Sequence, residues 1–249
     1  MRPSRLGAKH SVAIYPDKPQ LAEAAADRFI EAVENAVGER GRCFIALAGG
    51  STPRDLYSRL AARGGELGRG WENVHLLWGD ERAVPPESAD SNYRMAKEAL
   101  LDHLPIPAAN LHRIRGESDP GKAAAEYSET IQGLANPLRF DLTLLGLGGD
   151  GHTASLFAGT PVLDERQEEV AAVFVDELKA WRITLTLPIL NRSRQVVFLV
   201  AGASKADMVR RIHSLQSPSK AYPASLVQPG SGSLLWMLDE EAAQGILTG

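Results

Sequence analysis

The stretch CFIALAGGSTPRDL, residues 43–56, contains the change of pattern on which the fold depends. Its first six residues are apolar and few enough to form a buried strand, which Gly49-Gly50 then ends. Pro53 follows in a position typical of the first turn of a helix, and Ser51 or Thr52 can cap that helix. The stretch therefore predicts a strand, a tight turn and a helix in succession, which is the repeating unit of an α/β fold.

The same alternation continues along the chain on both sides of this stretch. Apolar residues recur at helical spacing in LAEAAADRFIEAVENAV, residues 21–37. Further buried strands are predicted at 74–78, 140–145, 170–175, 182–187 and 196–201, and helices near 53–63, 92–102, 120–134 and 204–214. We therefore expect one domain over residues 1–249, with a mostly parallel sheet, helices on both faces and ligands at the carboxyl ends of the strands.

Composition limits the kind of partner and compartment. The 249 residues carry 27 basic and 31 acidic side chains, and the resulting charge of −4 gives no broad positive field for nucleic acid. The single cysteine, Cys43, lies in an apolar run and is expected to be a buried thiol. The chain has no apolar run of 18 residues and no signal-peptide pattern, so we expect a cytoplasmic protein without a membrane partner. Its oligomeric state stays open, with a monomer favoured.

Two loops after predicted strands carry groups that suit a phosphate. In ALAGGSTPRDL, the glycines let the backbone approach a ligand, and the helix start offers unpaired N–H groups. In LLWGDERAVPPESADSN, Arg82 could make a multidentate contact to phosphate, and Ser91 can cap the next helix. An ordinary capped turn and a solvated charge cluster are the alternatives for these two loops.

A third loop, LGLGGDGHTASLF at residues 145–157, places His152 and Asp150 in a glycine-rich strand end. The glycines satisfy G-x-G-x-x-G, but the match lies in the second half of the chain, without a clear acidic strand end about 20 residues later. We interpret them as bending the backbone so that His152 is presented as a general base, with free N–H groups beside it for an oxyanion. Ser155 is a weaker candidate as a nucleophile because G-x-S-x-G is absent, and the histidine spacing argues against a metal site.

A fourth loop, FLVAGASKADMVR, places Lys205 near a helix start. A lysine there adds its charge to the positive end of the helix dipole, which favours anion binding over stability. Arg182, at the start of RITLTLP, could reach the same region. An exposed surface lysine is the alternative.

Taken together, these loops are familiar. The segments LAGGSTP, WGDERAVPPESADSN, LHRIRGE, LGLGGDGHTASLF, RITLTLP and PAS followed by W-x-x-D at 223–239 resemble the 6-phosphogluconolactonases, of the glucosamine/galactosamine-6-phosphate isomerase-like superfamily. The resemblance covers nearly the whole chain in order, except for the first ten residues. One departure is Ala158, where the family usually has proline.

The resemblance implies a modified Rossmann-like, sugar-phosphate-isomerase-like fold without cofactor or metal. It implies hydrolysis of 6-phospho-D-glucono-1,5-lactone to 6-phosphogluconate in the oxidative pentose phosphate pathway, with this small molecule as the partner. His152, with Asp150, matches the catalytic position, although the roles of Asp80 and Asp150 stay open. The positions matched to substrate and phosphate binding are Gly49, Gly50, Ser51, Thr52, Asp80, Arg82, Asn92, Gly148, Gly149, Arg182 and Lys205.

Two alternatives remain from the sequence. Glucosamine-6-phosphate deaminases and related isomerases share a D-G-H element but typically continue it as GHIAFNEP, whereas this chain reads GHTASLF. A non-catalytic sugar-phosphate sensor would use the same pocket, but such sensors commonly carry a DNA-binding segment, and no spare helix-turn-helix region or basic tail is evident.

Overall fold

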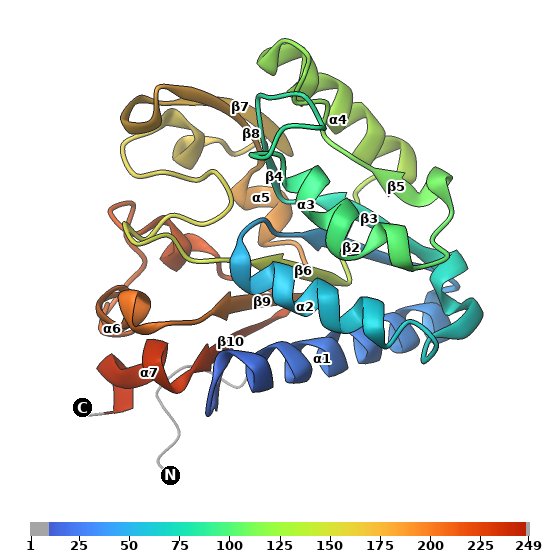
Figure 1. Cartoon of the computed structure of the whole chain (residues 1–249). Helices are drawn as coiled ribbons and strands as arrows, with labels where there is room; N and C mark the ends of the chain where they lie inside the picture. Colours follow the sequence, from blue (N-terminus) through green and yellow to red (C-terminus); the bar gives the residue numbers. More distant parts are fainter. Residues whose placement is uncertain (1–9, 248–249) are drawn as a thin grey trace.

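A parallel sheet forms the centre of the computed structural model, which describes residues 10–247 (Figure 1). Its seven strands follow the order β1-β10-β9-β6-β2-β3-β5, and every neighbouring pair is parallel. The strands are β1 (His10–Tyr15), β2 (Cys43–Leu47), β3 (Val74–Trp78), β5 (Leu111–His112), β6 (Leu142–Leu145), β9 (Gln195–Val200) and β10 (Ser233–Asp239). The predicted α/β fold with a mostly parallel sheet is confirmed, and Cys43 is buried as expected.

Helices connect these strands and cover the sheet. They are α1 (Lys18–Arg40), α2 (Ser51–Ala62), α3 (Asn92–Ala99), α4 (Pro120–Leu134), α5 (Leu187–Leu190), α6 (Ala206–His213) and α7 (Glu240–Leu247). Because parallel crossovers are right-handed, α1, α2 and α3 cover one face and α4 and α6 the other. Consistent with this, α1 packs on α2 and α2 on α3 (Figure 1). None of the helices within residues 10–247 combines the length and the apolar character needed to cross a membrane.

The local sequence sets where the longest helix begins and ends. The Asp17 side chain accepts the Gln20 N–H at 2.8 Å and so caps the start of α1, which also has proline in its first turn. Gly41 ends the helix in the left-handed region, at φ 74°, and its N–H bonds to the Val37 carbonyl. One face of α1 is buried at helical spacing, including Leu21, as the apolar periodicity predicts.

The order of the strands reverses between β2 and β6. From β2 the chain proceeds to β3 and β5 on one side, whereas from β6 it proceeds to β9 and β10 on the other. The loops that follow these two neighbouring strands therefore diverge and leave a crevice at the carboxyl edge of the sheet. In open α/β sheets, ligands bind at such a reversal point.

Two of the predicted strands do not join this sheet. β7 (Val170–Val175) and β8 (Ala180–Leu185) form a separate antiparallel sheet with β4 (Asp80–Arg82), beside α4 (Figure 1). Residues 80–82, expected to be a loop, are therefore a strand. β7 and β8 pair in antiparallel fashion because only a short turn joins them, whereas a parallel pair would need a long crossover.

This small sheet presents alternate side chains of β4 to opposite faces. Asp80 and Arg82 share one face with their β8 partners, Thr184 and Arg182. Glu81 points to the other face and is almost completely buried.

Glu81 holds the start of α3 against this sheet. Its carboxylate accepts the backbone N–H groups of Asn92 and Tyr93, each at 2.8 Å, and the hydroxyl of Ser91 at 2.9 Å. Ser91 itself accepts the Arg94 N–H, so it caps α3 as the sequence predicts. Burial raises the pKa of Glu81, and these hydrogen bonds to its charged form oppose that rise. Glu81 thereby fixes Asn92, a predicted binding residue, relative to β4.

Replacing Glu81 with Ala should destabilise the protein, because buried donors of α3 lose their acceptor. We expect the free energy of unfolding to fall by at least about 2 kcal/mol, as is usual when several buried donors are left unpaired. Urea denaturation monitored by circular dichroism measures the loss. Glu87→Ala, which removes an exposed glutamate from the same segment, is the control and should change stability little. Equal stability of the two variants would contradict this role of Glu81.

Candidate functional site

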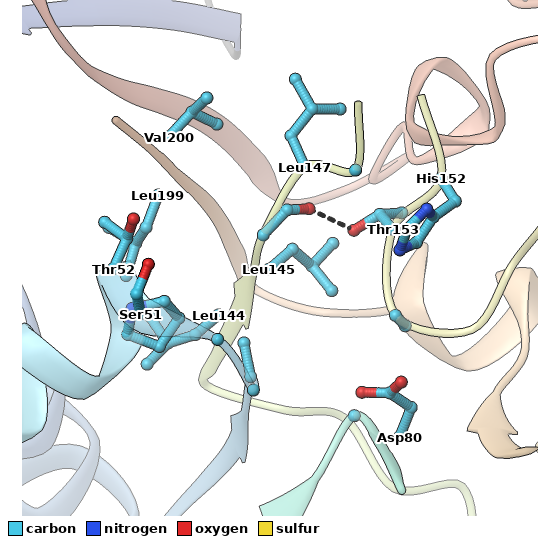
Figure 2. A pocket seen from close by; sticks show the side chains of 18 of the residues that line it. Ser51, Thr52, Asp80, Leu144, Leu145, Leu147, His152, Thr153, Leu199 and Val200 are labelled. Carbon is cyan, nitrogen blue, oxygen red and sulfur yellow. Dashed lines mark hydrogen bonds between the residues drawn. The ribbon is translucent and has the colours of Figure 1, made fainter. Parts of the chain in front are cut away.

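A cavity of about 340 Å³ occupies the crevice at the carboxyl edge of the sheet (Figure 2). Its walls come from the segments that follow β2, β3, β6 and β9, the strands on both sides of the reversal point. Ten residues predicted from the sequence line it: Gly49, Gly50, Ser51, Thr52, Asp80, Arg82, Asn92, Gly148, His152 and Lys205. Gly149, Asp150 and Arg182 do not line it.

The start of α2 forms one wall of the cavity. Gly50 occupies the N-cap position at φ 102°, a left-handed conformation that favours glycine, and no side chain caps the helix. The expected capping by Ser51 or Thr52 is therefore wrong, since both residues lie inside the first turn. As a consequence, uncapped N–H groups of this turn are available to a ligand. In Figure 2, Ser51 and Thr52 lie across the cavity from His152.

Asp80 is held by two side chains at the base of the cavity. Its Oδ2 atom accepts the Ser155 hydroxyl at 2.6 Å, and its Oδ1 atom accepts the Asn92 amide at 3.2 Å. Gly49 packs directly on that amide, because a Cβ atom at residue 49 would lie 2.0 Å from Asn92 Oδ1. Ser155 is 1% exposed and serves as an anchor for Asp80, which agrees with the weak case for it as a nucleophile.

His152 and Asp150 form a hydrogen-bonded pair. The ring Nδ1 atom lies 2.5 Å from Asp150 Oδ1, and the His152 backbone N–H donates to the same oxygen at 3.1 Å. Burial raises the pKa of the Asp150 carboxyl, but the hydrogen bonds and charge of His152 outweigh it and hold that pKa below its usual range. One face of the imidazole stacks on Phe157, with 4.1 Å between ring centroids. With Nδ1 engaged by Asp150, Nε2 is left as the ring atom that can accept a proton.

The glycines shape the loop that carries this pair. A Cβ atom at Gly148 would lie 2.1 Å from His152 Nδ1, so only glycine lets the imidazole pack there. Gly151 adopts φ 88°, and its carbonyl accepts the Ala224 N–H at 2.9 Å.

The backbone amides of this loop are less available than the sequence suggests. The Gly148 N–H donates to the His152 carbonyl at 2.8 Å, and the Gly151 N–H donates to the Gly148 carbonyl at 3.1 Å. The expectation that glycine amides beside His152 are free for an oxyanion is therefore corrected for these two groups. Amides without a side-chain cap remain at the start of α2, which lies across the cavity from His152.

Two cationic side chains, Arg82 and Lys205, line the cavity. Arg82 donates to the Asp90 carbonyl, and its cross-strand neighbour is Arg182. Burial, followed by the positive charge of Arg82, lowers the pKa of Arg182. Two like charges on directly opposed residues destabilise a sheet, so this arrangement favours an anion nearby.

Lys205 reaches the cavity from the start of α6. Within the described part of the chain its ammonium has no acidic partner. The preceding turn is fixed by Asp239, whose two carboxylate oxygens accept the Gly202 N–H at 3.0 and 2.9 Å. The Asp of the W-x-x-D segment thus holds the loop that carries Lys205.

The remaining histidines lie outside the cavity. His75 and His112 contact each other at 3.2 Å across β3 and β5, and burial lowers the pKa of both. No cluster of three or more potential metal ligands occurs among residues 10–247.

Sequence reasoning missed three residues that support the site. Glu81 was seen only as part of a charge cluster, Ser155 only as a weak nucleophile, and Phe157 only as part of a motif. Glu81 and Ser155 form buried hydrogen bonds with residues that are distant in the chain. Phe157 stacks on His152 because the loop that carries both residues folds back on itself. A spacing pattern carries no signal for such contacts.

Comparison with known proteins agrees with this geometry. The family model of glucosamine-6-phosphate isomerases/6-phosphogluconolactonase matches residues 16–236. A 6-phosphogluconolactonase of Nostoc sp. is 39% identical over 240 residues, covering 94% of this chain and 97% of its own length. That of Synechocystis sp. is 40% identical over 236 residues, covering 92% and 95%.

Among solved structures, the 6-phosphogluconolactonase from Trypanosoma cruzi superposes with a TM-score of 0.85 at 28% identity. The match covers 98% of this chain and 99% of that one. Similarity in sequence and in fold therefore extends over almost the entire chain and includes every segment that lines the cavity. The chain belongs to the glucosamine-6-phosphate isomerase/6-phosphogluconolactonase family, in which it resembles the 6-phosphogluconolactonases.

Proposed function

We propose that this protein hydrolyses 6-phospho-D-glucono-1,5-lactone to 6-phosphogluconate, as part of the oxidative pentose phosphate pathway. The observation that carries the proposal is the position of His152, paired with Asp150, across one cavity from an uncapped helix start and from Lys205, which has no acidic partner among the described residues. One side of the cavity thus offers a base, and the other offers contacts for an anion. A phosphorylated lactone needs both.

The phosphate is assigned to the side of the cavity formed by α2 and Lys205. The first-turn amides, the hydroxyls of Ser51 and Thr52 and the Lys205 ammonium all border the same space. Helix starts of this kind bind phosphate through N–H groups and the helix dipole. The arginines of the small sheet, Arg82 and Arg182, add positive charge to the rim.

With the phosphate held there, the lactone carbonyl is directed toward His152. Nε2 takes a proton from water, and the resulting hydroxide attacks the carbonyl carbon to give a tetrahedral oxyanion. Asp150 accepts a hydrogen bond from Nδ1–H, so that proton stays on the ring. The negative charge of Asp150 also stabilises the imidazolium that forms. The imidazolium then gives its proton to the ring oxygen as the carbon–oxygen bond breaks, which opens the ring and restores the neutral base. The steps use only water and side chains of this chain.

The deaminase alternative is disfavoured by the surroundings of His152. Among the described residues the imidazole has one carboxylate partner, Asp150, at Nδ1, and the apolar ring of Phe157 covers one of its faces. The segment GHTASLF thus places a phenylalanine where the deaminase-like run GHIAFNEP has a glutamate. Absence of ammonia release from glucosamine 6-phosphate would agree with this reading.

The sensor alternative predicts tight binding of 6-phosphogluconate without any lactone turnover.

Removing the phosphate from the substrate should weaken catalysis strongly. We expect gluconolactone to have a kcat/KM at least about 100-fold below that of the phosphorylated lactone, because several charge-assisted hydrogen bonds are lost. Lys205→Ala should narrow this difference by raising KM for the phosphorylated lactone only. Initial rates corrected for spontaneous opening measure both effects. Similar kcat/KM values for the two lactones in the wild type would rule out the phosphate site.

Replacing His152 with Ala should lower kcat by about 10²–10⁴-fold, the usual contribution of a positioned general base. Affinity for 6-phosphogluconate should change much less, since the phosphate contacts lie across the cavity. His103→Ala, at an exposed histidine outside the cavity, is the control and should leave kcat unchanged. Stopped-flow hydrolysis measures the rate and calorimetry the affinity. A folded His152→Ala variant that keeps most of its turnover would remove the proposed base.

Replacing Asp150 with Asn should lower kcat by about 10- to 100-fold, less than the loss of His152 itself. The amide cannot stabilise the imidazolium, and its NH₂ group can favour the wrong tautomer of the ring. KM should change little because Asp150 does not line the cavity. A rise in KM at constant kcat would instead show that Asp150 acts in binding.

A further inference from the structure

A second cavity, of about 370 Å³, lies at the amino ends of β2, β6 and β9. It is thus on the opposite edge of the sheet from the proposed active site and shares no lining residue with it. Four arginines line it, Arg40, Arg42, Arg139 and Arg194, with Asp141 as the single acidic residue. In a chain with a net charge of −4, this is a local concentration of positive charge.

Part of this arrangement is structural. Asp141 is 7% exposed, and its Oδ2 atom accepts the Phe44 N–H at 2.9 Å. Its Oδ1 atom is shared by Arg40 at 3.0 Å and Arg194 at 3.2 Å. Asp141 therefore joins the end of α1 to the starts of β2, β6 and β9. This structural role explains why its carboxylate lies between the guanidinium groups of Arg40 and Arg194.

The other two arginines, Arg139 and Arg42, have no acidic partner among the residues that line the cavity. Arg139 donates to the carbonyl oxygens of Arg192 and Ser231, which are uncharged acceptors. Arg42 is exposed, and its guanidinium lies 5.1 Å from the centre of the Phe44 ring. Its side chain forms no ion pair or hydrogen bond with any residue between 10 and 247. The cavity therefore keeps an excess of positive charge and free N–H donors.

We propose that this arginine cavity binds a small molecule bearing a pyrophosphoryl group. Guanidinium groups hold phosphate oxygens through paired hydrogen bonds, and the energy of such charge-assisted bonds exceeds that of neutral ones. The arginines come from three separate segments around the cavity, so two linked phosphates match them better than one. The volume lies in the lower range of small-molecule sites. Inorganic pyrophosphate and nucleoside diphosphates share this chemistry.

Titration calorimetry at physiological ionic strength tests the proposal with two probes, inorganic pyrophosphate and ADP. We expect a binding event in the wild type that Arg42→Glu weakens at least tenfold, the effect of losing one charge-assisted contact. Arg28→Glu makes the same change of charge on α1, outside the cavity, and should bind as the wild type does. Equal affinity for both probes would assign recognition to the pyrophosphoryl group alone, and tighter binding of ADP would assign it to a nucleotide.

Lys205→Ala separates this cavity from the proposed active site, since pyrophosphate could also enter the latter. The binding of pyrophosphate that Arg42→Glu weakens should persist in Lys205→Ala. The rate of lactone hydrolysis by Arg42→Glu should match that of the wild type. Unchanged binding in Arg42→Glu, or loss of all binding in Lys205→Ala, would overturn the proposal. Arg42 forms no ion pair with Asp141, so Arg42→Glu should keep the melting temperature of the wild type. If Arg42→Glu lowers the melting temperature, Arg42→Gln takes its place in the test.

Discussion

The parallel pairing of β2 with β6 is the constraint on which the rest of the site depends. Ile45 lies beside Leu142 and Ala46 beside Thr143, yet the chain leaves the two strands toward opposite edges of the sheet. The helix that follows β2 and the glycine loop that follows β6 therefore diverge at the carboxyl ends of these two strands. One side of the gap becomes a helix start, which favours anions, and the other becomes a loop that carries His152. The cavity is a direct consequence of the order of the strands.

Residues outside the cavity hold its walls in place, and they explain segments that would otherwise have no role. Asp239 fixes the turn before Lys205, and the Ala224 N–H fixes the carbonyl of Gly151. Gly116, in LHRIRGE, packs on the strand that carries Arg82, because a Cβ atom there would lie 2.3 Å from the Arg82 carbonyl oxygen. Glu81 fixes the start of α3. Each contact sets the direction of one wall without touching the enclosed space.

The two basic regions of the molecule differ in what their charges do. At the carboxyl edge, Lys205 has no acidic partner among the described residues and shares one cavity with uncapped amides and a histidine. At the amino edge, Arg40 and Arg194 share Asp141 and so join secondary-structure elements, while Arg42 remains unpaired among the described residues. The first arrangement combines binding with a proton acceptor, whereas the second has no base positioned to do chemistry. We therefore infer catalysis at one edge of the sheet and binding alone at the other.

The sequence by itself determined the type of fold and the position of the loops that line the cavity. Buried strands alternating with amphipathic helices allow few topologies other than a parallel sheet, and the glycine runs mark where the backbone must turn. It therefore identified His152, Lys205 and the start of α2 as members of one site, since the carboxyl ends of parallel strands share an edge. These predictions depend on local pattern, which a single chain displays.

Only the tertiary structure decided the contacts between distant segments. The pairing of β4 with β8 placed Arg82 opposite Arg182, and it turned a predicted loop into a strand. In the folded glycine loop, the N–H groups of Gly148 and Gly151 form hydrogen bonds within the loop, Asp150 bonds to Nδ1 of the His152 ring, and Phe157 stacks on a face of that ring. The physical reason is that hydrogen bonds and ring contacts are short-ranged and directional. They are set by the register and packing of several elements at once, which spacing along one chain does not record.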